Sequence, residues 1–293
     1  MPVRYQPGHF VRHSKLGVGK ILSVPHHNIV EVFFSDDVDR PRKKISTDKV
    51  HMELIHESEA PAWLVNLDLE LARRKDHLTA PAAMQKFRNI FKDGFDAPSY
   101  TSKERDYKWT AHCLWNDSLN REEYTRLLSN EEWEEIVVRA LAVEAKTNLL
   151  SPYEKMPLRD ALKTSAAAKT FCRGLYDLIY GDDGFENRFD RFTGTLEALP
   201  QPKSSTVKWP IQTFFPFIAM PGNHLFLKPE VTNQAAERRG YQLNYKSEPN
   251  WLTYSCLLKF ARIVKDELVS AGLNPRDMID IQSYIWVTGD DTY

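Results

Sequence analysis

Residues 8–34 read GHFVRHSKLGVGKILSVPHHNIVEVFF, and this stretch decides how the N-terminal part of the chain folds. It is dense in Val, Ile and Phe, which favour a half-buried pleated surface. We therefore expect strands over residues 10–13, 20–24 and 29–34. Gly17 and Gly19 mark the first turn or a bulge, because glycine tolerates backbone conformations that other residues avoid.

Two more short strands are expected, over residues 44–46 and 50–55, with chain reversals at residues 25–28 and 36–41. Five short strands at this spacing close best as a small barrel, because closure removes exposed sheet edges. The sequence thus predicts an α+β protein with an SH3/Tudor-like β-barrel module at residues 1–56. A polar segment, HESEAPA at residues 56–62, separates it from a mostly helical domain at residues 63–293.

The second part carries apolar residues at the helical period. Its caps and breaks predict helices over residues 63–75, 81–94, 102–114, 129–149, 157–161, 169–180, 229–239, 250–271 and 274–289. Residues 181–205 are rich in loop-forming residues and are expected to divide this domain into two lobes. Residues 225–227 (LFL) predict a short buried strand.

The composition excludes several classes of protein. The chain has 293 residues, of which 42% are hydrophobic, so it can bury a core and is not wholly disordered. A net charge of -1 gives no global field toward nucleic acid or a membrane. Its three cysteines, Cys113, Cys172 and Cys256, are too few and too scattered for a disulfide framework. With no signal peptide or transmembrane run, we expect a cytoplasmic location.

A family resemblance rests on residues of the first module. They are Pro7, Gly8, Val11, His13, Leu16, Gly17, Gly19, Lys20, Ile21, Val30, Val32 and Phe34. Their order resembles the Tudor-like module at the C-terminus of the UvrD/PcrA helicases. It is also similar to the RNA polymerase-interaction modules of CarD-like proteins and of the transcription-repair coupling factor. The resemblance covers about one sixth of the chain. It implies docking onto a protein partner, RNA polymerase being the usual one, or onto nucleic acid, and it implies no catalysis.

Basic residues are concentrated in the same module. Residues 1–56 hold nine Lys/Arg against six Asp/Glu, a local net charge of +3. The candidates for binding a partner or nucleic acid are Arg12, Lys15, Lys20, Arg40, Arg42, Lys43 and Lys44. The alternative is an ordinary solvated sheet edge, where lysine also prevents strand-to-strand aggregation.

No catalytic, metal-binding or cofactor-binding motif is expected. The segment GVGK at residues 17–20 lacks the spacing of a phosphate-binding loop and runs into a strand. The histidines at positions 9, 13, 26 and 27 have no nearby cysteine to complete a zinc site. His112 and Cys113 are adjacent on a helix and point about 100° apart, so they would not form a catalytic pair.

Three functions therefore stay open. The first is a non-enzymatic bacterial interaction protein that docks through its barrel. The second is a nuclease-like or hydrolytic component of a bacterial defence or mobile-element system, built from Asp183, Glu186, His224, Lys228 and Glu230. Residues 277–287 (DMIDIQSYIWV), which resemble segments of uncharacterised bacterial proteins from such loci, motivate this second reading. The third is a structural subunit that buries the aromatic segment at residues 209–217 in a complex.

Overall fold

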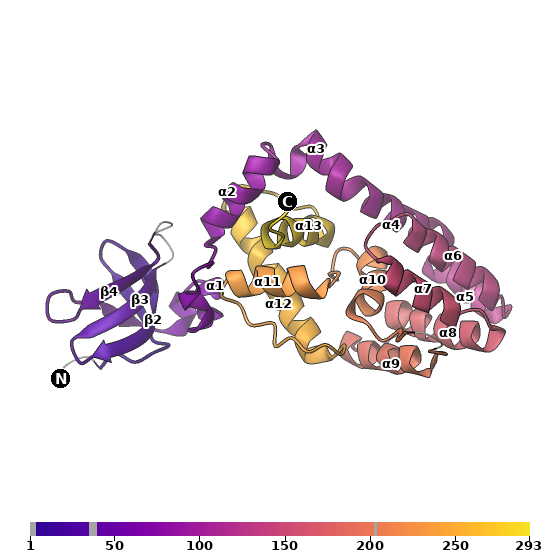
Figure 1. Cartoon of the computed structure of the whole chain (residues 1–293), viewed down its shortest axis with the longest axis horizontal. Coiled ribbons are helices and arrows are strands. Elements are labelled where there is room, and N and C mark those ends of the chain that lie inside the picture. Colours follow the sequence, from indigo (N-terminus) through magenta and orange to yellow (C-terminus); the bar gives the residue numbers. More distant parts are fainter. Residues whose placement is uncertain (1–3, 35–39, 202–203) are drawn as a thin grey trace. The chain divides into compact units, whose positions relative to one another are not determined.

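The computed structural model describes residues 4–34, 40–201 and 204–293, and it shows one sheet near the N-terminus followed by helices (Figure 1). The chain divides into two compact units. The first unit comprises residues 1–90, 233–243 and 288–293, and the second comprises residues 91–232 and 244–287. The segment at 181–205 lies within the second unit. The predicted reversal at residues 36–41 falls mostly outside the described residues.

The sheet has five antiparallel strands, as the sequence predicts. They are β1 (Phe10–His13), β2 (Gly17–His26), β3 (Ile29–Phe34), β4 (Arg42–Ser46) and β5 (Glu53–Ile55). Their order across the sheet is β4-β3-β2-β1-β5, so the first strand pairs with the last. The α+β class is confirmed.

Both faces of the sheet are apolar. Side chains alternate between the two faces along each strand, and apolar residues occur at successive positions of the strands. One face carries a cluster that includes Val11, Ile21 and Val32. The opposite face carries Phe10, Leu22 and Phe33, and the following segment covers it with Leu64, Leu67 and Ala72. The segment after the sheet is therefore built into the first unit and occupies one face of the sheet.

Gly19 is required by close packing within the sheet. A Cβ at this position would lie 2.7 Å from Val32 Cγ1 and 2.9 Å from the carbonyl oxygen of Phe33. We expect Gly19→Ala to lower the free energy of unfolding by about 1–3 kcal/mol through overpacking. A urea titration measures this, with Gly194→Ala as control, because a Cβ at Gly194 meets no atom within 4 Å apart from its own helix and chain neighbours, and alanine inside α9 is expected to leave stability unchanged or raise it slightly. A Gly19→Ala variant as stable as the parent would contradict the packing.

The first unit adds short helices to the sheet. They are η1 (Glu57–Glu59), α1 (Ala62–Val65), η2 (Leu71–Arg73) and α2 (Ala80–Ile90), joined by the end of α11 (Pro229–Arg238). The predicted single helix over residues 63–75 is wrong. Asp68 Oδ1 accepts hydrogen bonds from the N–H groups of Glu70 and Leu71, which starts a new turn in place of a continuous helix.

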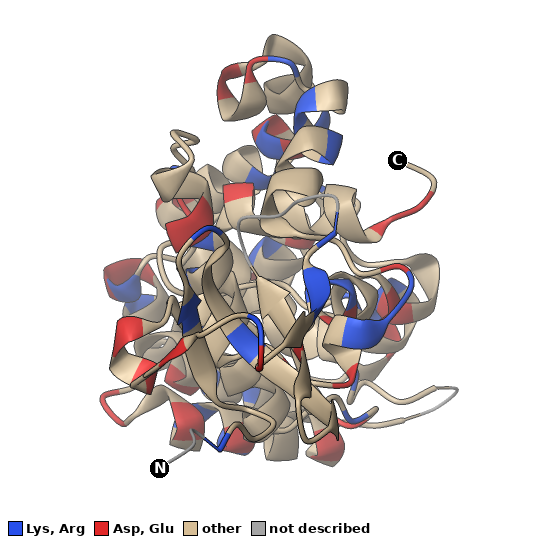
Figure 2. Ribbon diagram, turned by 90° about the vertical axis from the view of Figure 1, so that its left-hand side faces the viewer, with Lys and Arg blue, Asp and Glu red and all other residues tan. Residues whose placement is uncertain are grey.

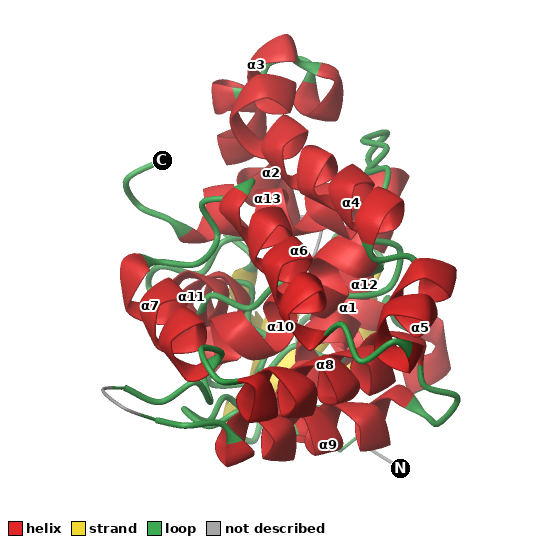
Figure 3. Cartoon of the chain, turned by 90° about the vertical axis from the view of Figure 1, so that its right-hand side faces the viewer, coloured by secondary structure: helices red, strands yellow, loops and turns green. Residues whose placement is uncertain are grey.

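Among its described residues, the regular elements of the second unit are all helices, joined by loops (Figure 3). It contains η3 (Gly94–Asp96), α3 (Pro98–Tyr100), the π-helical turn η4 (Thr101–Arg105), α4 (Asp106–Ser118), α5 (Arg121–Ser129), α6 (Trp133–Ala145), α7 (Pro152–Ala161), α8 (Ser165–Tyr180), α9 (Phe185–Ala198), α10 (Trp209–Ala219), α12 (Trp251–Ser270) and most of α13 (Met278–Gly289). None of the helices described is long and apolar enough to span a bilayer.

Several predicted elements of this unit need correction. Residues 185–198 form α9, not a loop. Residues 225–227 are buried but form no strand. The predicted helix over 129–149 is shorter in the structure, since α5 ends at Ser129, Glu131 adopts a φ of 58° and α6 spans Trp133–Ala145. Ser102 lies inside the π-helical turn and does not cap α4.

A buried network of charges joins the start of α4 to α13. Asp280 is fully buried and accepts hydrogen bonds from Tyr100 Oη (2.7 Å), Arg105 Nη1 (2.8 Å) and Arg276 Nε (2.8 Å). Beside it, Lys108 Nζ donates to Glu104 Oε2 at 3.1 Å and to Ser283 Oγ at 2.8 Å. Because each of these charges has an opposite charge beside it, we interpret the network as a structural element of the second unit.

Candidate docking site on the N-terminal sheet

The outer edge of β4 is the feature of the sheet best suited to bind another chain. The N–H of Phe34 donates to Pro41 at 2.7 Å, and the N–H of Thr47 donates to Asn28 at 2.9 Å. Bonded positions alternate in an antiparallel pair, so the main-chain groups of Arg42 and Lys44 point away from β3. Within the described part of the chain, β4 pairs with no strand other than β3.

The free edge is short and well defined. The carbonyl oxygen of Ser46 also lies on the outer side, but it accepts hydrogen bonds from the N–H groups of Lys49 and Val50. Within the described residues, the outward main-chain groups of β4 open to a partner are therefore those of Arg42 and Lys44, together with the N–H of Ser46. Arg42 and Lys44 are two positions apart, and an added strand also forms its main-chain hydrogen bonds with every second residue of the edge. An extended peptide could therefore pair with β4.

This edge is also positively charged. Residues 40–49 contain five Lys/Arg and one acid, Asp48, which accepts a hydrogen bond from Asn28 Nδ2 at 2.9 Å. Lys44 is exposed, and the guanidinium of Arg42 donates to the carbonyl oxygen of Arg73 at 2.7 Å. Figure 2, with the sheet toward the viewer, shows the Lys and Arg segments on its strands. Asp36, Asp37 and Asp39 lie outside the described residues.

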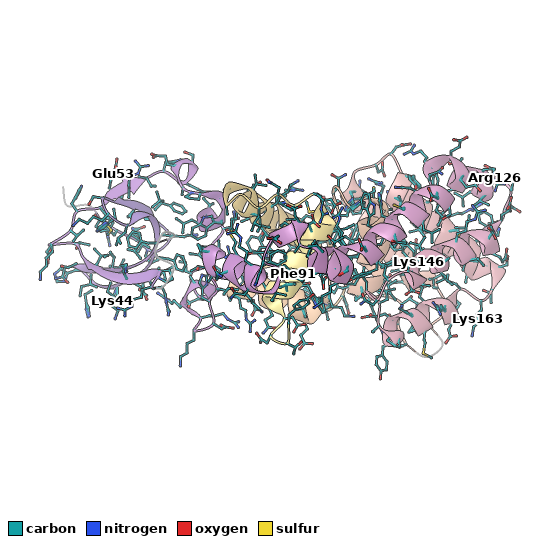
Figure 4. All side chains as sticks on the ribbon, turned by 90° about the horizontal axis from the view of Figure 1, so that it is seen from above. Lys44, Glu53, Phe91, Arg126, Lys146 and Lys163 are labelled. Atoms are coloured by element: carbon teal, nitrogen blue, oxygen red, sulfur yellow. The ribbon has the colours of Figure 1, made fainter. Side chains whose placement is uncertain are left out.

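The basic candidates do not form a single surface. Arg12 lies on β1 and its guanidinium pairs with Glu53 at 3.7 Å and Glu59 at 3.3 Å. Glu53 belongs to β5, which is the opposite edge of the sheet from Lys44 (Figure 4). Lys15 lies in the turn between β1 and β2. The structure thus brings together Arg40, Arg42, Lys43 and Lys44 and leaves Arg12 and Lys15 elsewhere.

Lys20 has a structural role that the sequence does not reveal. Its side chain is buried, and Nζ donates to the carbonyl oxygens of Val65 and Leu67 at 2.8 Å each. Burial lowers the pKa of this amine. The Lys20 amine thereby fastens the sheet to the segment that covers it and is not exposed to bind a phosphate or a carboxylate.

Three of the five residues proposed for a nuclease-like site have other partners or surroundings, and the remaining two, Glu186 and Glu230, are exposed. Lys228 Nζ pairs with Glu154 at 2.9 Å, and Asp183 pairs with Arg191 at 2.7 Å. His224 is buried, with its ring 3.9 Å from that of Phe185, and burial lowers its pKa to about 3. Among the described residues, no group of three or more His, Cys, Asp or Glu could hold a metal ion.

The cysteines provide no reactive pair. Cys172 is fully buried and burial raises the pKa of its thiol to about 12, so it stays protonated. Cys113 is exposed, while the neighbouring His112 turns its Nδ1 to the carbonyl oxygen of Ile218 at 2.7 Å.

Comparisons with protein-family models, with curated proteins and with solved structures found no match for this chain.

Proposed function

We propose that the chain is a non-enzymatic interaction protein that docks onto a protein partner through the outer edge of β4. The observation that carries the proposal is the pair of outward main-chain positions at Arg42 and Lys44, set in a basic segment. An extended, acidic segment of a partner fits this edge, because main-chain hydrogen bonds supply affinity and the lysine and arginine side chains supply charge complementarity.

RNA polymerase, or another machine that works on DNA, is the partner class that the Tudor-like and CarD-like resemblance implies. The strand order, with the first strand paired to the last, supports this part of the proposal because it gives the small five-stranded antiparallel sheet that the resemblance implies, while the β4 edge stays unpaired among the described residues. One face of the sheet is already covered by residues 64–72. Docking at the β4 edge leaves that face undisturbed.

Binding of purified RNA polymerase core enzyme to the full chain tests the proposal. We expect Lys44→Pro to weaken binding by about tenfold or more, because proline removes the outward N–H while the bonds between β4 and β3 remain. Lys44→Glu weakens binding through charge. Lys15→Glu makes the same charge change in a turn away from the edge and is expected to bind like the parent.

Two results would overturn the proposal in distinct ways. If the parent chain does not bind the polymerase, the partner assignment fails. If it binds duplex DNA in a salt-dependent manner that Lys44→Glu and Lys15→Glu weaken equally, the module is a nucleic-acid binder and the β4 edge is not its site.

A further inference from the structure

A second surface, in the helical second unit, joins exposed aromatic rings to lysines. We call it the tyrosine–lysine surface; its residues are Tyr153, Lys155, Met156, Lys208, Tyr245 and Lys246. Tyr153 is 83% exposed and Met156 57% exposed, although both lie on α7, whose other side is buried. Tyr245 is also exposed, in the loop between α11 and α12.

Hydrogen bonds and ring packing place these segments side by side. Lys208 Nζ donates to the carbonyl oxygen of Tyr153 at 2.9 Å, which joins the start of α10 to α7. The next residue, Trp209, donates through Nε1 to the carbonyl oxygen of Lys246 at 2.7 Å, and its ring lies 6.4 Å from that of Tyr245. A single buried tryptophan thus holds the Tyr245 loop beside the helix that carries Tyr153.

The charge of this surface is positive. Its segments contain the cations Lys155, Arg159, Lys208, Lys228 and Lys246 against the acids Glu144, Glu154, Asp160 and Glu248. Asp160 pairs with Lys163 at 2.6 Å. Glu144 is fully buried and pairs with Lys155 and Arg159, while Glu154 pairs with Lys228. Glu248, in the loop that carries Tyr245 and Lys246, is exposed beside the tyrosine–lysine surface.

We propose that the tyrosine–lysine surface binds single-stranded nucleic acid. Exposed rings offer stacking platforms for unpaired bases, and nearby lysines neutralise the phosphates between them. A protein partner fits less well, because lysine is depleted at the centres of protein interfaces. Duplex DNA fits less well too, since its bases are already stacked and cannot reach the Tyr153 ring.

Fluorescence anisotropy of the full chain with a labelled oligothymidylate, and with a duplex of equal length, tests this inference. We expect tighter binding of the single strand. Tyr153→Ala is expected to weaken it by at least about fivefold, because stacking on a ring contributes at the level of a kcal/mol or more per base. Tyr153→Phe keeps the ring and is expected to bind within about twofold of the parent.

The charge is tested separately. Lys246→Glu is expected to reduce the slope of log affinity against log salt by about 0.7 for each phosphate that the lysine neutralises in the parent. Lys103→Glu, an exposed lysine on the π-helical turn, is the matched control, and Lys44→Glu shows whether the β4 edge takes part. The proposal fails if the parent does not bind the single strand, if it binds the duplex equally, or if Tyr153→Ala or Lys246→Glu behaves like the controls.

Discussion

Replacing Asp280 by alanine is expected to lower the free energy of unfolding of the second unit by about 3–5 kcal/mol. The substitution removes an acceptor that is fully buried and shared by Tyr100, Arg105 and Arg276. The Arg105 guanidinium, whose side chain is only 9% exposed, keeps Asp277 as its remaining partner. The large cost comes from leaving a buried cation and a buried hydroxyl incompletely paired.

A urea titration followed by tryptophan fluorescence measures this loss. Six of the seven tryptophans, all except Trp63, lie in the second unit, so the signal reports mainly on its unfolding. Asp182→Ala removes a carboxylate that is 98% exposed and is the matched control. An Asp280→Ala variant that unfolds at the same urea concentration as the control would show that the network does not stabilise the unit.

Acid is expected to destabilise the second unit through His224. Burial, with a smaller contribution from the nearby Arg188 charge, lowers the pKa of His224 from 6.5 to about 3. The unfolded chain therefore takes up a proton near pH 6.5, while the native ring stays neutral until about pH 3. Stability falls as the pH falls between these values, by about 1.4 kcal/mol per pH unit and about 4 kcal/mol from pH 6.5 to 3.5.

His224→Gln isolates this effect. Glutamine keeps a hydrogen-bonding group near Tyr254 Oη, which lies 3.3 Å from His224 Nδ1, but it does not titrate. We expect the slope of the unfolding free energy against pH, measured from pH 4 to 6, to decrease in this variant by about 1.4 kcal/mol per pH unit, which is the contribution of one proton. An unchanged slope would mean that His224 is protonated in the native state. The description of native His224 as a buried, neutral ring would then be wrong.

The sheet was predictable from sequence because its signals are local. Val30, Val32 and Phe34 alternate along one strand, and Gly17 and Gly19 mark the preceding turn. The free edge at β4 was not predictable, since it depends on the register between β3 and β4, which no local sequence pattern fixes. The basic character of residues 40–44 pointed to the segment that forms this edge, but not to which main-chain groups face outward.

Two incorrect predictions, for the role of Lys20 and for residues 185–198, have physical causes. Lys20 reads as a surface cation, yet the carbonyl oxygens that bind its amine come from Val65 and Leu67, far along the chain. The helix α9 was hidden by the polar and glycine residues around it. Its apolar residues Phe189, Phe192 and Leu196 do follow the helical spacing. The sequence therefore contained the helical pattern, but the loop-like composition around it was given more weight.

Amide hydrogen exchange at β4, with and without bound RNA polymerase, tests the docking proposal most directly. In the free chain we expect the N–H groups of Arg42 and Lys44 to exchange rapidly, and that of Lys43, bonded to β3, to exchange slowly. With the partner bound, we predict that the Arg42 and Lys44 amides become protected. Partner binding that leaves both amides in rapid exchange would contradict strand addition at this edge.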